Sequence, residues 1–271
     1  MAWRRSRLAV AKTMILSRIN YGWRLLATGG CFAIFGLGGL TLSALVFPLL
    51  ALHRQEERLP RTRRLIQRAF ALFLKLMVCL GIMRLEVSGA EKLKNCRHMI
   101  VLANHPTLID VVALISLMPN ASCVVKEALW KNRFLGGVVR AAGYISNAGT
   151  ERLVEDCAAD LRSGRPLLIF PEGTRTVPGV PLDFQRGAAY IVLRSRLPVL
   201  PVLIDCNPTT LTKREKWYYI PPRPFHLRLQ VQDPLDVGQW VGEGETQAIA
   251  ARPLTQALET YFTQELEKWK H

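Results

Sequence analysis

The pattern of apolar and polar positions divides the chain into two parts. Residues 25–52 contain no charged side chain, and as a helix this stretch would extend about 42 Å, against a bilayer hydrocarbon core of about 30 Å. A second apolar stretch, residues 65–83, is interrupted by Arg68 and Lys75 and predicts an amphipathic helix at a membrane interface. From residue 85 onward, short apolar runs alternate with stretches of helical spacing. We therefore expect a membrane-anchoring helical region over residues 1–84 and a globular domain over residues 85–271.

Two arrangements of the apolar stretch 25–52 remain open. It is long enough for one membrane span, whereas its glycines and Pro48 would weaken a continuous helix and suit a bent, re-entrant hairpin. A signal peptide fits poorly, because the apolar run is too long and arginines follow it in place of a small-residue cleavage site. A buried core helix is the weaker alternative.

The globular part alternates strand-like and helix-like segments. Short apolar or β-branched runs predict strands at residues 85–89, 98–104, 122–126, 143–147, 166–172, 198–205 and 226–232. Helical spacing occurs at residues 107–117, 131–142, 151–164 and 187–196, and residues 246–270 predict an amphipathic closing helix. Such alternation implies an α/β fold, in which helices cover both faces of a mixed, largely parallel sheet. Ligands of such sheets bind beyond the carboxyl ends of the strands.

Positive charge is concentrated in the N-terminal region. The formal net charge of the chain is +15; residues 1–84 hold 14 Lys and Arg and two acidic residues, which gives +12 and leaves +3 for residues 85–271. A nucleic-acid-binding protein would be expected to spread its basic residues over the folded domain. Basic residues on both flanks of an apolar stretch suit anionic lipid headgroups, although they leave no clear positive-inside asymmetry. We therefore expect membrane lipids, and no nucleic acid, as partners.

The six cysteines form no CxxC pair and no metal-ligand spacing. The sequence also contains no HExxH motif and no cysteine–histidine ligand set. We expect reduced thiols in a cytosolic compartment and no requirement for a metal.

The sequence NHPTLID, residues 104–110, places His105 and Asp110 five positions apart after a predicted strand. Within one continuous helix the two side chains would be about 140° apart and would not meet. Pro106 favours a helix that begins after His105, which leaves the imidazole free to fold back toward Asp110. An Asp that accepts from one imidazole nitrogen leaves the other nitrogen to act as a general base. The alternative is that Asp110 and Thr107 only favour the helix N-terminus.

The sequence IFPEGTR, residues 169–175, follows another predicted strand. Arg175 is suited to bind a phosphate through two parallel hydrogen bonds, and Gly173 lets the backbone approach a substrate closely. The alternative is a strand-to-loop turn that carries surface charges. The two motifs together are more specific than either one alone.

With these motifs the chain resembles the glycerophospholipid acyltransferases of the 1-acyl-sn-glycerol-3-phosphate acyltransferase type. NHPTLID matches the NHx4D block of that family, and FPEGTR at residues 170–175 matches its second block completely. FQRGA at residues 184–188 matches a weaker third block, and the family's proline-containing strand is matched by LPVLPVLI. Lys126 and Glu127 stand where the family has a lysine–glutamate pair. The resemblance covers approximately residues 85–220.

The resemblance implies an acyltransferase domain over residues 85–271. It would move a fatty acyl group from acyl-acyl-carrier-protein or acyl-CoA to the free hydroxyl of a lysophospholipid, without a covalent intermediate and without a cofactor. His105, oriented by Asp110, would be the general base. The resemblance favours 1-acyl-sn-glycerol-3-phosphate as the acceptor, and the product would be phosphatidic acid. The candidate substrate-binding residues are Asn104, Thr107, Lys126, Glu172, Gly173, Thr174, Arg175, Arg186 and Gly187.

One block departs from the family pattern. Where the family has an arginine a few residues after a glycine-led strand, this chain has Asn147 and Ala148, with Arg152 further on. In the family that arginine is thought to help hold the phosphate of the acceptor. A different lysolipid, including one without phosphate, is therefore the alternative acceptor.

Two other functions are less well supported. A lipid hydrolase would use a similar His–Asp pair, but it needs a nucleophile, and no GxSxG sequence occurs. A non-catalytic lipid-binding membrane protein would have no evident reason to keep His105, Asp110, Glu172 and Arg175 together. We therefore expect an enzyme. We expect it at a bacterial-type inner membrane, with its catalytic domain facing the cytoplasm.

Overall fold

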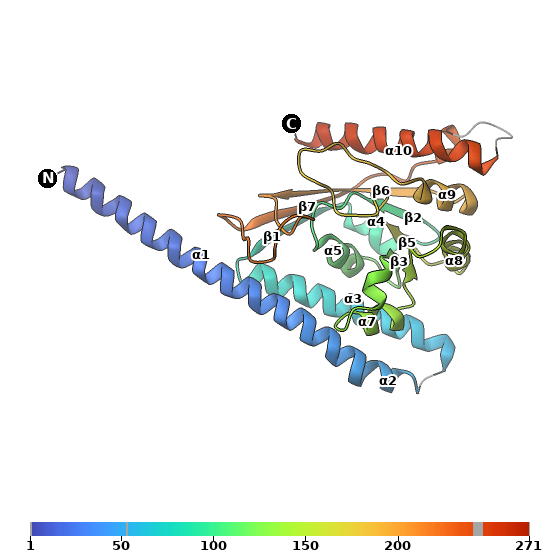
Figure 1. Cartoon of the computed structure of the whole chain (residues 1–271), viewed down its shortest axis with the longest axis horizontal. Coiled ribbons are helices and arrows are strands. Elements are labelled where there is room, and N and C mark those ends of the chain that lie inside the picture. Colours follow the sequence, from blue (N-terminus) through green and yellow to red (C-terminus); the bar gives the residue numbers. More distant parts are fainter. Residues whose placement is uncertain (1, 53, 241–245, 271) are drawn as a thin grey trace.

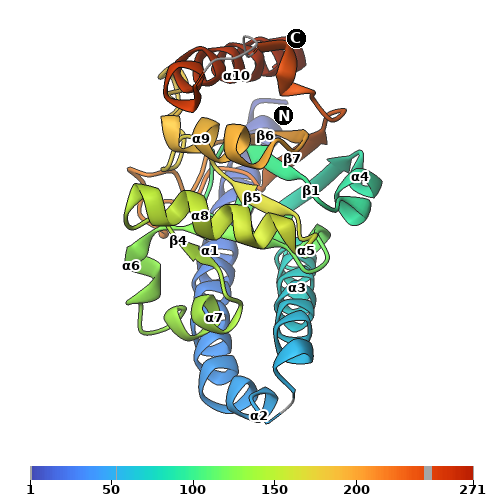
Figure 2. The same cartoon turned by 90° about the vertical axis from the view of Figure 1, so that its right-hand side faces the viewer.

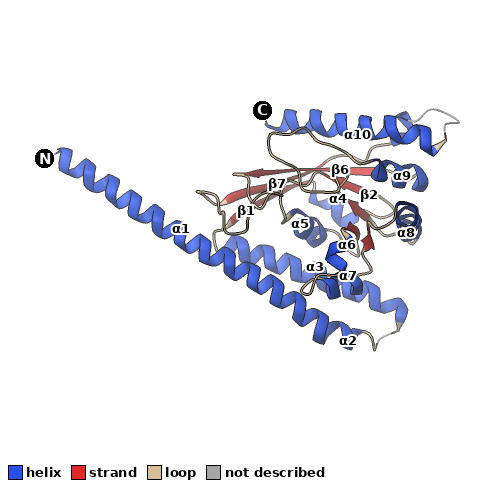
Figure 3. Cartoon of the chain, in the orientation of Figure 1, coloured by secondary structure: helices blue, strands red, loops and turns tan. Residues whose placement is uncertain are grey.

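The computed structural model describes residues 2–52, 54–240 and 246–270. A seven-stranded sheet lies between layers of helices, and a long helical hairpin runs along one side of the molecule (Figures 1 and 3). The strands are β1 (Met83–Ser88), β2 (Ile100–Ala103), β3 (Ser122–Val125), β4 (Ile145–Ser146), β5 (Leu167–Ile169), β6 (Val199–Asn207) and β7 (Phe225–Val231). All seven predicted strands are therefore confirmed, with shifted ends.

The strand order in the sheet is β1-β7-β6-β2-β5-β3-β4. β6 and β7 are antiparallel, and the other neighbouring strands pair in parallel. This arrangement confirms the predicted mixed, largely parallel sheet. The central strands are nearly continuous apolar runs because helices cover the sheet on both sides.

Helices cover the two faces of the sheet (Figure 1). One face is covered by α8 (Thr150–Arg162), α9 (Arg186–Ser195) and α10 (Gln247–Lys270), and the other by α3 (Gln55–Cys79), α5 (Asp110–Leu117) and α7 (Gly136–Ala141). Shorter elements are α4 (Ala90–Asn95), α6 (Glu127–Trp130) and a 3-10 turn (Val237–Trp240). Buried residues of β2 alternate between the two cores: Ile100 and Leu102 face α9 and α10, whereas Val101 and Ala103 face α3 and α5. α10 confirms the predicted closing helix.

The apolar stretch 25–52 belongs to one long helical segment. α1 (Ala2–Thr41) continues through a π-helical turn (Leu42–Val46) into α2 (Phe47–Leu50), and the chain reverses only after this point to enter α3. A re-entrant hairpin within residues 25–52, which the sequence left open, is not formed. Gly39 allows close packing, since a Cβ atom at this position would lie 2.7 Å from the carbonyl oxygen of Phe134. α1 and α3 lie side by side (Figure 2).

The helix predicted at residues 65–83 is α3, with different ends. α3 begins at Gln55 and stops at Cys79. Gly81 then adopts a left-handed backbone conformation with a φ of 69°, and Met83 starts β1. Glycine favours this stop because it has no Cβ atom to clash in that conformation.

Among the described residues, one helix is long and apolar enough to cross a membrane, over residues Leu16–Leu50. Only 11% of its most apolar window is buried within the protein. A core helix of a soluble domain would be mostly buried, so this helix leaves a large apolar surface without a partner in the fold.

Two buried arginines attach the helical hairpin to the globular domain. A terminal nitrogen of Arg63 on α3 lies 3.6 Å from a carboxylate oxygen of Asp160 on α8. Arg24 on α1 donates to the carbonyl oxygens of Pro221 at 2.6 Å and Pro222 at 2.8 Å. A buried guanidinium needs such partners because an unpaired charge is costly away from water. These contacts place the hairpin against the domain in a defined position.

Candidate active site

The two sequence motifs leave the sheet at the same edge. β2 and β5 are parallel neighbours, and Leu102 is paired with Ile169. The chain therefore leaves β2 toward His105 and leaves β5 toward Glu172 at adjacent positions on the carboxyl edge of the sheet. This edge is where ligands of largely parallel sheets bind.

His105 and Asp110 meet as the sequence predicts, but the following helix begins later than predicted. Nδ1 of His105 lies 2.9 Å from Oδ2 of Asp110. α5 begins at Asp110, so the prediction that Pro106 starts the helix is wrong. The main-chain N–H of Thr107 donates to Asp110 Oδ2 at 2.8 Å, and this bond closes a turn over residues 106–109 ahead of the helix. The carboxylate then lies in the first turn of α5, where the helix dipole favours a negative charge.

The His105–Asp110 pair is buried at the aspartate and open at the histidine. The side chain of Asp110 is 0% exposed and that of His105 is 14% exposed. Burial raises the pKa of Asp110, and the hydrogen bonds from His105 and the Thr107 N–H act against this rise. The imidazole stacks on the ring of Phe170, with centroids 4.2 Å apart. No described residue hydrogen-bonds to Nε2 of His105, so this nitrogen is available to a substrate.

Glu172 holds the loop that carries His105. Its Oε1 atom accepts from the main-chain N–H of His105 at 3.0 Å and from the hydroxyl of Thr176 at 2.6 Å. The N–H of Thr176 donates to the carbonyl oxygen of His105 at 2.7 Å. Burial raises the pKa of Glu172, and the hydrogen bond from Thr176 acts against this rise. Sequence reasoning missed Thr176, whose only signal is that it directly follows the FPEGTR motif.

Arg175 is anchored to the loop that follows β6. One of its terminal nitrogens donates to the carbonyl oxygens of Leu211 at 2.7 Å and Thr212 at 3.0 Å. Burial lowers the pKa of Arg175, and the negative charge of Asp110 acts against this change. The loop after β6 was not among the predicted site residues, because nothing in its sequence indicates that its carbonyl groups meet an arginine 36 residues earlier.

The glycine and threonine of the second motif lie on the surface of the same loop. Gly173 is exposed and has a left-handed backbone with a φ of 61°. A side chain there would be strained, which accounts for the glycine in the motif. Lys126, at the end of β3, donates from Nζ to the Thr174 hydroxyl at 3.5 Å. The structure therefore brings Lys126 to the FPEGTR loop.

The remaining predicted residues take different positions around the site. Asn104 is buried, and its amide exchanges two hydrogen bonds of 2.8 Å with the main chain of Ile204, so it joins β2 to β6 and both of its polar atoms are used. The hydroxyl of Thr107 is buried without a partner among the described residues. Arg186 and Gly187 begin α9 beside the FPEGTR loop, because the N–H of Gln185 donates to the carbonyl oxygen of Pro171 at 2.8 Å.

An apolar cavity of about 340 Å³ adjoins the His105–Asp110 pair. Leu108 and Ile109, in the turn between the two catalytic candidates, line its end nearest the pair. Its walls come from α1, α3 and α7, and they include Phe32, Phe35, Phe70, Phe73, Val138 and Val139. Sequence reasoning missed this cavity because its walls come from segments far apart in the chain.

No group of three or more His, Cys, Asp or Glu side chains is placed to hold a metal ion in the part of the chain that the structure describes. The six cysteines are all free thiols.

The fold and the site together define an α/β protein with a histidine–aspartate pair at the carboxyl edge of its sheet. Residues 84–205 match the family model described as Acyltransferase, and the chain therefore carries an acyltransferase-family domain. The resemblance that the motifs indicate is thereby confirmed. The matched residues end within β6 and contain both the NHPTLID and the FPEGTR motifs.

Curated relatives of the chain are 1-acyl-sn-glycerol-3-phosphate acyltransferases. The chain is 28% identical over 166 residues to that enzyme of Cocos nucifera, which covers 59% of this chain and 52% of the relative. It is 25% identical over 192 residues to the alpha enzyme of Mus musculus, which covers 68% of this chain and 65% of the relative. The chain thus spans between about half and two thirds of the length of these relatives.

The fold is similar to that of a solved acyltransferase structure. The crystal structure of the 1-acyl-sn-glycerophosphate acyltransferase PlsC from Thermotoga maritima matches 89% of this chain and 97% of its own chain, with a TM-score of 0.58 and 21% sequence identity. At this identity the match establishes the fold.

Proposed function

We propose that the protein is a membrane-associated acyltransferase that moves a fatty acyl group from acyl-acyl-carrier-protein or acyl-CoA to the free hydroxyl of a lysophospholipid. The observation that carries this proposal is the His105–Asp110 pair, with Nδ1 and Oδ2 2.9 Å apart and Nε2 free beside the FPEGTR loop. The relatives favour 1-acyl-sn-glycerol-3-phosphate as the acceptor and phosphatidic acid as the product.

The proposed reaction is one general-base step. With the Nδ1 proton directed to Asp110, the lone pair on Nε2 takes the proton of the acceptor hydroxyl. The hydroxyl oxygen attacks the thioester carbonyl, the carbon–sulfur bond breaks, and the thiolate leaves and receives a proton from the imidazolium. No acyl–enzyme bond forms and no cofactor takes part. Such base catalysis contributes on the order of 10²- to 10⁴-fold to the rate.

The apolar cavity is suited to hold the acyl chain during this step. It begins at Leu108 and Ile109, next to the base, and extends between α1 and α3. Burial of each methylene of a fatty acyl chain contributes about 0.8 kcal/mol, so a cavity lined by aromatic rings favours a long acyl group over water. The carbonyl carbon would then lie near His105 Nε2.

Cationic groups beside the cavity entrance are proposed to hold the phosphate of the acceptor. Arg175 is fixed in place by its bonds to the loop after β6, and its other guanidinium N–H groups have no partner among the described residues. These donors suit a phosphate. Lys126 and Arg186 lie on elements that border the same loop and are proposed to assist, while Gly173 and Gly187 leave space for the headgroup.

Helix Leu16–Leu50 is proposed to attach the enzyme to its lipid substrates. The helix leaves most of its apolar surface uncovered by the fold, and it forms a wall of the proposed acyl cavity. A lipid acceptor could therefore enter from the bilayer by lateral movement. We propose a bacterial-type inner membrane, with the domain of residues 85–271 on its cytoplasmic side.

A different lysolipid acceptor is the alternative that a specific observation favours. Asn147 stands near the position of the family's phosphate-binding arginine, and its Oδ1 atom accepts from the N–H of Glu127 at 3.0 Å. This neutral side chain supports the start of α6 and supplies no positive charge. An acceptor with less phosphate charge would suit this environment.

The test measures transfer of labelled acyl groups by the purified protein, from each of the two donors to a panel of lysolipids with and without phosphate. We expect transfer to 1-acyl-sn-glycerol-3-phosphate, and a loss of at least ~100-fold in His105→Ala with unchanged membrane attachment. Transfer only to phosphate-free acceptors would establish the alternative. No transfer with any acceptor, or full activity in His105→Ala, would refute the proposed mechanism.

A further inference from the structure

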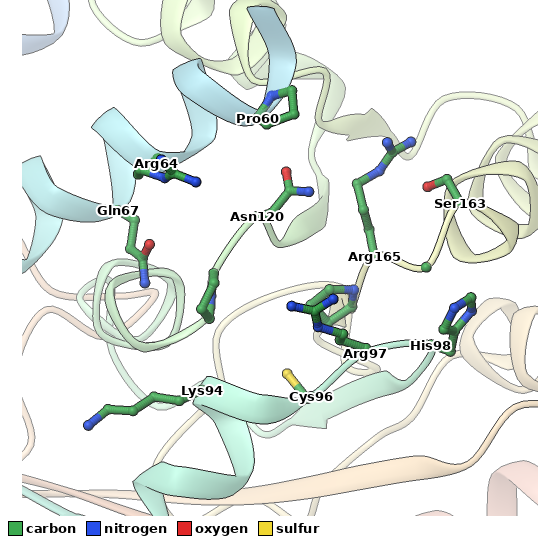
Figure 4. Close-up of a pocket in the computed structure, with 13 residues that line it drawn as sticks. Pro60, Arg64, Gln67, Lys94, Cys96, Arg97, His98, Asn120, Ser163 and Arg165 are labelled. Atoms are coloured by element: carbon green, nitrogen blue, oxygen red, sulfur yellow. The ribbon is translucent and has the colours of Figure 1, made fainter. Parts of the chain in front are cut away.

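A second cavity lies at the opposite end of the sheet from the His105–Asp110 site. It has a volume of about 430 Å³ and is lined by residues that precede β2, β3 and β5, together with the first half of α3 (Figure 4). The proposed active site lies beyond the carboxyl ends of β2 and β5. The two sites are therefore separated by the length of the central strands.

Four Lys and Arg side chains line this cavity, and three of them have no acidic partner among the described residues. Arg64 comes from α3, Lys94 from the end of α4, and Arg97 from the loop before β2. Figure 4 shows the guanidinium groups of Arg64 and Arg97 pointing into the open space. Of the residues that the structure describes, no Asp or Glu lines the cavity, and none forms an ion pair with these three side chains. Positive charge is thus gathered around a hollow without a counter-charge.

Arg165 also lines the cavity, but unlike Arg64, Lys94 and Arg97 it has an acidic partner. Its guanidinium is paired with the carboxylate of Asp160, which also faces the buried Arg63. The carboxylate of Asp160 therefore neutralises Arg165 in the cavity wall and the buried Arg63. The side chains of Arg64 and Arg97 are exposed, so their positive charges are available to bind a ligand.

The backbone around the cavity is also unusual. His98 and Asn120 line it and have left-handed φ values of 50° and 53°, and these are two of the four such non-glycine residues in the described chain. Conformations of this kind cost free energy and are often retained at binding sites. Oδ1 of Asn120, a residue that lines the cavity, is buried without a hydrogen-bond partner in the described part.

We propose that this cavity binds a phosphate group, held by Arg64 and Arg97, with Lys94 at the rim. An arginine fork suits phosphate oxygens, and two forks from separate elements define a site for one such group. The volume lies within the range of small-molecule sites and accommodates a glycerophosphate-sized group. The phosphate could belong to a phospholipid headgroup or to a soluble phosphate ester. This site is independent of the proposed acyl transfer.

The first arm of the test uses the full-length protein in detergent. Its thermal unfolding midpoint is measured against inorganic phosphate, pyrophosphate and glycerol 3-phosphate, with sodium chloride at equal ionic strength as the reference. The test variant is Arg64→Gln with Arg97→Gln. The controls are Arg252→Gln, at an exposed arginine on α10, and Arg175→Gln, which removes the proposed active-site cation.

The second arm uses the same variants in nanodiscs of phosphatidylcholine with and without phosphatidylglycerol. A headgroup site predicts a midpoint that rises with phosphatidylglycerol, whereas a soluble ligand predicts a saturable rise with a phosphate ester. In either case we expect the double variant to reduce the apparent affinity at least tenfold and both controls to keep it. The proposal is overturned if neither form of phosphate stabilises the wild type, or if the double variant responds as the wild type does.

Discussion

The main-chain N–H of His105 donates to Oε1 of Glu172 at 3.0 Å. The two sequence motifs are therefore parts of one structure: the carboxylate of FPEGTR holds the loop that carries the imidazole of NHPTLID. Thr176 strengthens this contact, since its hydroxyl bonds to Glu172 and its N–H bonds to the carbonyl oxygen of His105. Glu172 thus acts as a positioning residue, and its side chain is turned toward the protein.

Replacing Glu172 should separate positioning from substrate binding. Glu172→Gln keeps an Oε1 acceptor for the His105 N–H, whereas Glu172→Ala removes it and releases the loop. We expect Glu172→Ala to lower kcat about 100-fold with little change in KM for the acceptor, because small displacements of a reacting group cost this much. Glu172→Gln should recover much of the loss. Steady-state kinetics of the two variants checks this, and equal losses in both, or an effect confined to KM, would contradict the positioning role.

Replacing Asp110 by Asn should leave the fold intact and reduce the rate. The amide has nearly the same size, but it no longer favours the tautomer that leaves Nε2 free as a base. We expect a loss on the order of 10²- to 10⁴-fold in kcat. Asp156→Asn, on an exposed part of α8, is the matched control and should retain activity. A loss of less than tenfold in Asp110→Asn, with an unchanged unfolding midpoint, would exclude the proposed orientation of His105.

Enlarging the apolar cavity should change the preferred acyl length. Phe35 on α1 lines the cavity and packs on Phe73 of α3, with ring centroids 5.0 Å apart. We expect Phe35→Ala to shift kcat/KM toward longer acyl donors, by roughly tenfold in the ratio of long to short chains. Leu72→Ala is the control, because the Leu72 side chain on α3 is 70% exposed and does not line the cavity. A donor series with each variant measures the ratio, and an identical chain-length profile would exclude this cavity as the acyl site.

The buried thiols should make the protein unstable at alkaline pH. Burial raises the pKa of Cys96 to about 11, and of Cys123, Cys157 and Cys206 to about 12, from an ordinary value of 9.0. Unfolded thiols lose their protons near pH 9 while the folded ones keep theirs. Their contribution to stability is therefore complete below pH 9 and is lost as the pH rises toward the folded values.

Cys157→Ala provides the check on this pH dependence. At pH 10.5 ionisation of one unfolded thiol favours unfolding by roughly 2 kcal/mol. The variant should therefore lose less stability than the wild type between pH 8 and pH 10.5, as measured by the unfolding midpoint at each pH. Parallel loss in the two proteins would show that Cys157 is not protected by burial.

The sequence alone determined the strands and the chemical groups of the site. Alternating apolar runs predicted all seven strands, because each strand is marked by a local pattern of burial. His105, Asp110, Glu172 and Arg175 were found from two short motifs, and helices within residues 1–84 followed from the length and composition of the stretches 25–52 and 65–83. Each of these properties depends on neighbours within a few positions.

Only the tertiary structure decided how these groups act. The bond between His105 and Glu172 joins positions 67 residues apart, and it exists because β2 and β5 are neighbours in the sheet. Local sequence patterns also did not predict three other features. These are the start of α5 at Asp110, the anchoring of Arg175 by Leu211 and Thr212, and the continuous helix through the glycines of α1. Contacts with distant segments, such as that of Gly39 with Phe134 and that of Leu108 with Leu211, outweigh a local preference of about 1 kcal/mol, which is too small to choose a conformation by itself.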